Sequence, residues 1–209
     1  MEFRIFDLGL ADFKNAWQFQ KEIFQEVKNN SFSAALILCR HEPVITLGRQ
    51  GKKDNIKASM HELKNMGIHV YEIERGGDVT YHGPGQLTAY PIFNLHYLKK
   101  DIHLFLRQLE ESIINLLSGL GITGVRHTGL TGVWIGKEKI ASIGIAIKNW
   151  ITFHGISINI KKEGMDNFHL IKPCGMNIQM TSLENILHRN VEIDDIKNSL
   201  IQAFRNNFH

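Results

Sequence analysis

The chain has 209 residues, of which 43% are hydrophobic and 22% charged, so it can bury a sizeable core, and we expect one domain spanning residues 1–209. Its net charge of +3 includes no dense Lys/Arg run, which argues against a nucleic-acid partner. No stretch is apolar enough to span a bilayer, the first residues lack the layout of a secretory signal, and two cysteines cannot make a disulfide framework, so we expect a cytoplasmic protein that binds no membrane.

Local patterns in the first half of the chain predict short strands and two helices. Alternation or short apolar runs indicate strands at residues 3–8, 34–39, 44–48, 69–74 and 86–95. Helical periodicity indicates helices at residues 11–29 and 55–66, the second of which Gly67 ends. Pro91 suggests that the strand at 86–95 lies at a sheet edge or carries a bulge, because proline cannot donate to a β-ladder.

The second half begins with the clearest helix, which Asp101 caps and which Gly119 and Gly121 end. Runs of strands rather than strict β-α-β alternation favour an α+β fold. The remaining elements are strands at 132–135, 139–148 and 151–160, and helices at 182–187 and 194–208.

Residues 75–86, with the sequence RGGDVTYHGPGQ, are the most informative stretch. Four glycines let the backbone turn sharply and approach a ligand closely, and functional residues gather on loops that a rigid scaffold holds. An ordinary tight turn is the alternative, but the density of polar groups favours a binding loop. The stretch lacks the third glycine of a dinucleotide fingerprint, and residues 132–137 are one residue too short for a P-loop, so a phosphate cradle has little support.

Cys174 and Lys139 are candidates for chemistry, although the residues alone leave both open. Cys174 lies between Pro173 and Gly175, which presents the sulfur for attack, but an inert thiol is about equally favoured. Lys139 begins an apolar strand face, and a simple turn lysine is the better interpretation from local sequence. The opposite face of that strand carries small residues that leave space for an extended ligand. No Cys/His spacing suggests zinc, and we expect no metal.

Several segments together are similar to the lipoyl(octanoyl) transferase family, which moves an octanoyl group from acyl carrier protein to a lysine of lipoate-dependent proteins. The order and spacing of these segments agree over nearly the whole chain. The matching segments are residues 75–86, 132–136 (GVWIG), 139–144 (KIASIG), 153–155 (FHG), Asn159 and 173–175 (PCG).

The resemblance implies a role for each matching residue. Cys174 is expected to be the nucleophile that accepts the acyl group, and Lys139 its acid/base partner. The implied fold is that of the biotin/lipoate protein ligase catalytic domain, a mixed β-sheet flanked by helices. The expected lining of the acyl pocket is Arg75, Gly76, Gly77, Asp78, Val79, Thr80, Tyr81, His82, Ser142, Ile143, Gly144, Gly155, Ile156 and Ser157.

The resemblance also implies the partners. We expect octanoyl-acyl carrier protein as donor, and as acceptors the lipoyl domains of 2-oxoacid dehydrogenase complexes and the glycine cleavage H protein. We expect no cofactor, and a monomer. An ATP-dependent lipoate or biotin ligase of the same fold is the main alternative, and a non-catalytic carrier-binding protein is a third.

Overall fold

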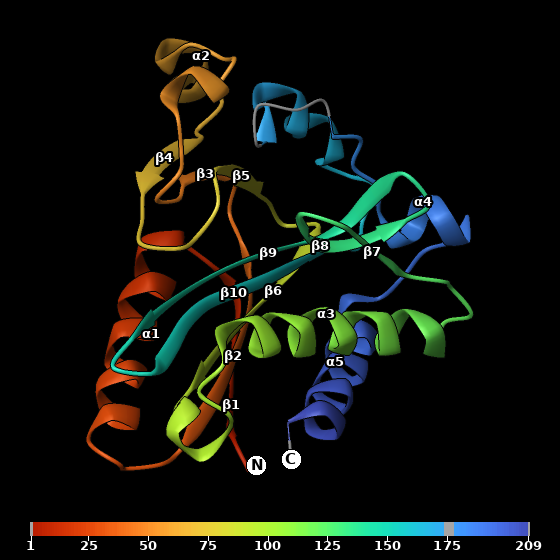
Figure 1. The fold of residues 1–209 in the computed structure, drawn as a ribbon. Helices are drawn as coiled ribbons and strands as arrows, with labels where there is room; N and C mark the ends of the chain where they lie inside the picture. The colour runs from red at the N-terminus through yellow and green to blue at the C-terminus, as the bar shows by residue number, and fades with distance from the viewer. Residues whose placement is uncertain (1, 174–177, 209) are drawn as a thin grey trace.

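The structure is a computed structural model that describes residues 2–173 and 178–208. Its centre is a mixed sheet of seven strands in the order β1-β2-β6-β10-β9-β8-β7, in which β1 and β2 pair in parallel and the other neighbours are antiparallel (Figure 1). The expected α+β fold with a mixed sheet is therefore confirmed. The strands are β1 (Arg4–Ala11), β2 (Ala34–His41), β6 (Gln86–Phe93), β7 (Val125–His127), β8 (Leu130–Ile135), β9 (Glu138–Lys148) and β10 (Ile151–Asn159).

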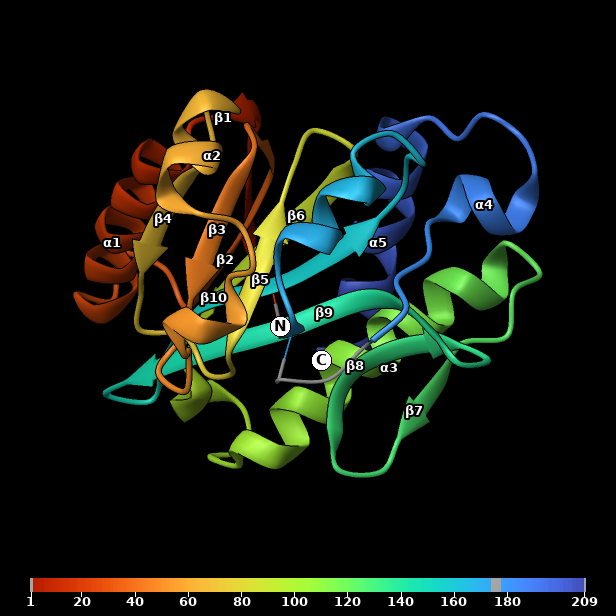
Figure 2. The same cartoon turned by 90° about the horizontal axis from the view of Figure 1, so that it is seen from above.

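Helices cover both faces of this sheet. Alternate residues of β2 show the two sides: Ile37 packs with α1 (Phe13–Lys28), whereas Leu36 packs with α3 (Ile102–Gly119) and α5 (Ile193–Asn207). Figure 2 shows α1 apart from the α3 and α5 pair. Asp101 caps α3 as the sequence predicts, because its Oδ1 accepts a hydrogen bond from the backbone N–H of Leu104 at 3.0 Å.

A second sheet of three strands, in the order β4-β3-β5, lies beside α1 (Figure 2). The strand β5 corrects the sequence analysis, which treats residues 75–86 as a loop throughout. Val79 and Tyr81 point into a small core, and the glycines on either side of the four-residue strand hide this alternation in the sequence. The elements of this part are β3 (Val44–Leu47), the 3₁₀ turn η1 (Lys53–Asn55), α2 (Met60–Asn65), β4 (His69–Glu72) and β5 (Val79–His82).

Pro91 lies in the middle of the large sheet, so the expectation of an edge strand is wrong. The β6–β10 ladder pairs Ala89 with Ile156, and an isolated bridge between Asn94 and Ile151 continues the same register, so the proline falls in an interrupted stretch. Thr152 replaces the missing ladder bonds, since its Oγ1 accepts from the Phe93 N–H at 2.9 Å and donates to the Pro91 carbonyl at 2.6 Å.

The remaining described elements are all short. None of the helices in the described part of the chain is long and apolar enough to cross a bilayer. Neither β7 of the large sheet nor the two 3₁₀ turns among these remaining elements is predicted from the sequence. The elements are η2 (Leu95–Tyr97), η3 (Met165–Leu170) and α4 (Leu183–Leu187).

Candidate active site

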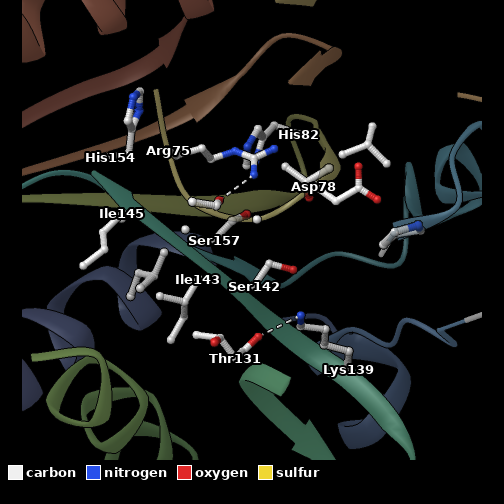
Figure 3. A pocket seen from close by; sticks show the side chains of 18 of the residues that line it. Arg75, Asp78, His82, Thr131, Lys139, Ser142, Ile143, Ile145, His154 and Ser157 are labelled. Atoms are coloured by element: carbon white, nitrogen blue, oxygen red, sulfur yellow. Dashed lines mark hydrogen bonds between the residues drawn. The ribbon is translucent and has the colours of Figure 1, made fainter. Parts of the chain in front are cut away.

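A cavity of about 420 Å³ opens where the three-stranded sheet meets the middle of the large sheet (Figure 3). One part of its wall is polar and comes from β5, β6, β10 and one face of β9, and another part is apolar and comes from α3, β8 and the other face of β9. Thirteen of the fourteen residues expected to line an acyl pocket line this cavity, and Lys139 does too. The lining includes Arg75, Gly76, Gly77, Asp78, Val79, Thr80, His82, Thr88, Tyr90, Ile102, Leu106, Leu130, Thr131, Lys139, Ser142, Ile143, Gly144, Ile145, Gly155, Ile156, Ser157, Pro173, Ile178 and Met180.

The floor of the cavity is a row of hydroxyl side chains that crosses three strands. Thr88 of β6 lies opposite Ser157 of β10, and Ser157 lies opposite Ser142 of β9. Two residues further along the strands, on the same face, Gly155 lies opposite Gly144, so no side chain fills the space above this pair. A Cβ at position 155 would lie 2.1 Å from the Ala89 carbonyl oxygen, so only glycine lets β10 approach β6 this closely.

The cavity passes around an open edge of β9. In the described part of the chain, β8 pairs with β9 only as far as Gly132 and Ser142, so residues 143–148 have no strand on that side. The turn at 75–77 binds this edge, because the Gly76 N–H donates to the Ile145 carbonyl at 2.8 Å. Side chains from both faces of β9 can therefore line one cavity.

Arg75 fixes the shape of that turn from within. It is 8% exposed, and its Nη2 donates to the Thr46 carbonyl at 2.7 Å while its Nη1 donates to the Gly76 carbonyl at 3.0 Å. The packing is tight, since a Cβ on Gly48 would lie 2.4 Å from the Gly77 carbonyl and one on Gly144 would lie 2.9 Å from the Gly76 carbonyl. Glycines at positions 48 and 144 thus let the turn pack closely against β9 and the end of β3, which places a buried guanidinium beside the cavity.

Lys139 lies at the other end, at the start of β9. Its Nζ donates to the Thr131 carbonyl at 3.0 Å and sits 4.8 Å from the centre of the Trp134 ring (Figure 3). The backbone on the far side of residues 174–177 runs beside it, because the Lys139 N–H donates to the Gln179 carbonyl at 2.8 Å. A Cβ on Gly132 would lie 2.6 Å from Lys139 Cε, and φ at Gly132 is +136°. Glycine at 132 is therefore what leaves room for this lysine.

His82 is buried and neutral at the polar end. Its Nδ1 lies 3.2 Å from Gln86 Oε1, which can only accept, so the proton is on Nδ1. The Ser157 hydroxyl donates to the same oxygen at 2.6 Å. Burial, together with the nearby His41, lowers the pKa of His82 to about 3. The ring therefore serves as a hydrogen-bonding group and carries no charge at neutral pH.

His154 has a left-handed backbone, with φ at +56°, where the cavity meets α1. Its N–H donates to Gln20 Oε1 at 2.9 Å, and its Nε2 lies 3.3 Å from Glu74 Oε2. The hydrogen bond from His154 lowers the pKa of Glu74 to about 2, whereas burial lowers the pKa of His154. A neutral imidazole thus donates to a carboxylate beside the turn at 75–77.

One of the expected site residues lies away from the cavity, and another lies outside the described residues. Tyr81 points away into the small core, where its hydroxyl accepts from Asn167 Nδ2 at 2.7 Å. Cys174 lies outside the described residues, although Pro173 and Ile178 on either side of residues 174–177 both line the cavity. Within the described part of the chain, no group of three His, Cys, Asp or Glu side chains could hold a metal ion.

The sequence analysis misses other lining residues. Thr88 and Tyr90 are two residues apart on β6, so both lie on the sheet face that holds the glycines of β9 and β10. This two-residue spacing is the sequence signal that could have identified them as lining residues. Leu106 lies on the apolar face of α3, where nothing local distinguishes a cavity wall from the core.

The comparisons with known proteins agree with this architecture. The chain matches the family described as lipoyl protein ligase A/B catalytic domain over residues 12–205. Among curated proteins, an octanoyltransferase of Caldicellulosiruptor saccharolyticus is 43% identical over 98% of this chain and 88% of its own length. One of Clostridium kluyveri is 44% identical over 95% of this chain and 83% of its own length.

Solved structures show the same fold. A lipoate-protein ligase A bound with ATP superposes with a TM-score of 0.81 at 19% identity, over 100% of this chain and 86% of its own. A biotin protein ligase of Aquifex aeolicus superposes with a TM-score of 0.57 at 12% identity, over 99% of this chain and 69% of its own. The expected ligase-like fold and the expected acyltransferase class are thereby confirmed, and the chain belongs to the lipoyl protein ligase A/B catalytic domain family.

Proposed function

We propose that this protein transfers an octanoyl group from octanoyl-acyl carrier protein to a lysine of a lipoyl domain, through a thioester on Cys174. The observation that carries the proposal is the position of Lys139 in a cavity that Pro173 and Ile178 also line. The octanoyltransferase relatives support the identity of the acyl group. In the proposal, the Cys174 thiolate is the nucleophile and Lys139 is the acid/base group.

The first half-reaction exchanges one thioester for another. The Cys174 thiolate attacks the carbonyl carbon of the donor thioester, and the carbon–sulfur bond to the carrier breaks. Lys139 gives its proton to the departing carrier thiolate, so the products are the carrier thiol, the octanoyl-enzyme and a neutral Lys139. One thioester replaces another, so this step needs no ATP.

The second half-reaction forms the amide. The acceptor lysine amine attacks the enzyme thioester and gives its proton to the neutral Lys139, and Cys174 leaves as a thiolate. This restores the starting charges and runs downhill from thioester to amide. Division of the transfer into two steps predicts ping-pong kinetics.

The apolar side of the cavity supports binding of an alkyl chain. Leu106 of α3, Leu130 of β8 and Ile143 of β9 line this side. Each buried methylene contributes about 0.8 kcal/mol, so shorter chains should lose affinity gradually. Longer chains should fail more abruptly, because they collide with the end of the cavity.

The remaining proposals concern partners. A bi-partite lipoate protein ligase from Thermoplasma acidophilum, described with its E2 lipoyl domain, superposes with a TM-score of 0.78 at 20% identity. We propose lipoyl domains of 2-oxoacid dehydrogenase complexes and the glycine cleavage H protein as acceptors. The proposed working form is a single-domain monomer in the cytoplasm.

Intact-protein mass spectrometry tests the nucleophile. The wild type mixed with octanoyl-acyl carrier protein should gain one octanoyl group, and Cys174→Ala should gain none. Cys39→Ala is the matched control, because Cys39 is 1% exposed and burial raises the pKa of its thiol, so this variant should acylate like the wild type. An adduct on Cys174→Ala would contradict the proposal.

Mass spectrometry of the lipoyl domain distinguishes the proposed transferase from an ATP-dependent ligase. Free octanoate, ATP and magnesium without acyl carrier protein should leave the lipoyl domain unmodified. Modification under those conditions would favour an ATP-dependent ligase. Binding of the carrier without any covalent adduct would favour a non-catalytic binding protein.

A further inference from the structure

Glu110 is a buried carboxylate on α3 that reaches across to the wall of the cavity. It is 1% exposed, and its Oε1 accepts from the Gly132 N–H at 3.1 Å. Its Oε2 accepts from Arg107 Nη1 at 2.6 Å and from Arg126 Nε at 3.0 Å. Both oxygens are therefore satisfied, and one of them is committed to a single backbone N–H of β8.

That N–H belongs to the same peptide group as the carbonyl that holds Lys139. The Gly132 nitrogen and the Thr131 carbonyl are joined by one amide bond, and Lys139 Nζ donates to this carbonyl at 3.0 Å. An amide is planar and its N–H and C=O point in opposite directions, so fixing one end fixes the direction of the other.

The position of this peptide group leaves Lys139 little freedom. Gly132 has φ at +136°, and a Cβ there would lie 2.6 Å from Lys139 Cε. The backbone of β8 is thus in direct contact with the lysine side chain. A shift of the Thr131–Gly132 peptide would move both the carbonyl that Nζ binds and the surface on which the side chain lies.

We infer that Glu110 is a positioning residue for Lys139, which it acts on through the Thr131–Gly132 peptide group. This inference rests on the proposed function for the role of Lys139, and it adds a specific residue outside the cavity to that site. Arg107 and Arg126 hold the second carboxylate oxygen, which leaves the first for Gly132.

Three substitutions separate positioning from a merely structural role. Glu110→Ala removes the acceptor, and Glu110→Asp keeps the charge but withdraws the carboxylate by one methylene. In Glu110→Gln the side-chain oxygen can still accept from the Gly132 N–H. The amide NH2 group then faces Arg107 and Arg126, whose side chains are 56% and 33% exposed and can turn to water. Glu111→Gln is the matched control, since Glu111 binds the same Arg126 at 2.5 Å, whereas the Gly132 N–H binds Glu110.

The direct readout is the reactivity of the Lys139 amine. Trace labelling with acetic anhydride from pH 7 to 11, followed by proteolysis and mass spectrometry, gives the pH midpoint for Lys139, with the exposed Lys14 as reference in the same digest. We expect Glu110→Ala and Glu110→Asp to move this midpoint by at least half a pH unit. Glu110→Gln and Glu111→Gln should keep it. A wild-type midpoint in folded Glu110→Ala or Glu110→Asp would overturn the inference.

Octanoyl transfer gives the second readout. In Glu110→Ala, kcat should fall at least tenfold while KM changes less than threefold, and Glu110→Gln should recover kcat to within threefold of wild type. Equal losses in both variants would overturn the inference. If Glu110→Ala does not fold, Glu110→Asp carries both readouts. If the wild type transfers no octanoyl group, that result contradicts the proposed function alone. The inference about Glu110 is still tested, because the labelling reports on Lys139 directly.

Discussion

Acid should destabilise this protein between pH 6.5 and 5 because of two buried histidines. Burial lowers the pKa of His41 to about 4 and that of His82 to about 3, and their ring centres lie 5.9 Å apart. Burial keeps His41 neutral, although its hydrogen bond to Ala11 favours the charged form: its Nδ1 donates to the Ala11 carbonyl at 3.2 Å and its Nε2 accepts from the Tyr90 hydroxyl at 2.6 Å. Protonation of His41 would break the hydrogen bond from Tyr90, and protonation of either ring would place a charge at a buried site.

The size of the effect follows from linkage. An unfolded histidine has a pKa of about 6.5, so below that pH the unfolded chain binds protons that the native chain refuses, and stability falls as pH falls. At pH 5 each of the two histidines removes about 2 kcal/mol relative to pH 8, and together they remove about 4 kcal/mol. That is a large share of the 5–15 kcal/mol of stability that is typical of a domain. Above about pH 6.5 the two histidines no longer lower the free energy of unfolding.

Urea unfolding at pH 5, 6, 7 and 8 measures this loss. His82→Asn keeps a donor for Gln86 but cannot titrate, so it should lose at most about half of the wild-type dependence on pH between 7 and 5, because His154, whose pKa burial also lowers, adds to that dependence. His103→Asn, at an exposed position of α3, should keep the full dependence. A wild-type stability that is flat between pH 7 and 5, or an unchanged slope in His82→Asn, would refute the reasoning.

Three further substitutions test the cavity and its scaffold. Gly76→Val should change the free energy of unfolding by less than about 1 kcal/mol, since the nearest atom to a Cβ there is 3.5 Å away, yet it should slow octanoyl transfer at least tenfold by narrowing the cavity; normal transfer would argue against this lining. Gly132→Ala should push β8 away from the Ala141 carbonyl, 2.5 Å from a Cβ there, and displace Lys139, so in the folded variant kcat should fall by a factor of about 10²–10⁴; near-normal kcat would contradict an acid/base role for the lysine. Thr152→Val should cost about 1–3 kcal/mol in urea unfolding, because it leaves two backbone groups of β6 unpaired, and a neutral effect would contradict this role.

The elements that could be predicted from sequence are those whose pattern is long and local. The helix α3 carries its apolar stripe over five turns and a capping aspartate, and β9 and β10 are long strands of eleven and nine residues. The strands β5 and β7 have only four and three residues, so each shows at most two inward positions. Pro91 misleads because its place inside the sheet depends on Thr152, which is distant in sequence.

The site depends even more on contacts between distant segments. Local sequence favours a turn position for Lys139, and only the resemblance to a family reverses that judgement. The structure supplies the physical reason: Gly132 on the neighbouring strand leaves space for the side chain, and the backbone at Gln179 pairs with the lysine. Neither contact has a signal in the residues around 139. Glu110 is equally invisible, because a glutamate on a long helix normally faces water.

The open edge of β9 explains how one cavity can have both a polar and an apolar wall. In a strand, successive side chains point to opposite faces, so Ser142 and Ile143 could not share a cavity inside a continuous sheet. Pairing between β8 and β9 stops at Gly132 and Ser142 in the described chain, and an edge offers unpaired backbone groups. The glycine turn uses one of them through the hydrogen bond from Gly76 to Ile145. The end of β8 pairing therefore creates the passage between the two faces, and the peptide group at that end is the one that contacts Lys139.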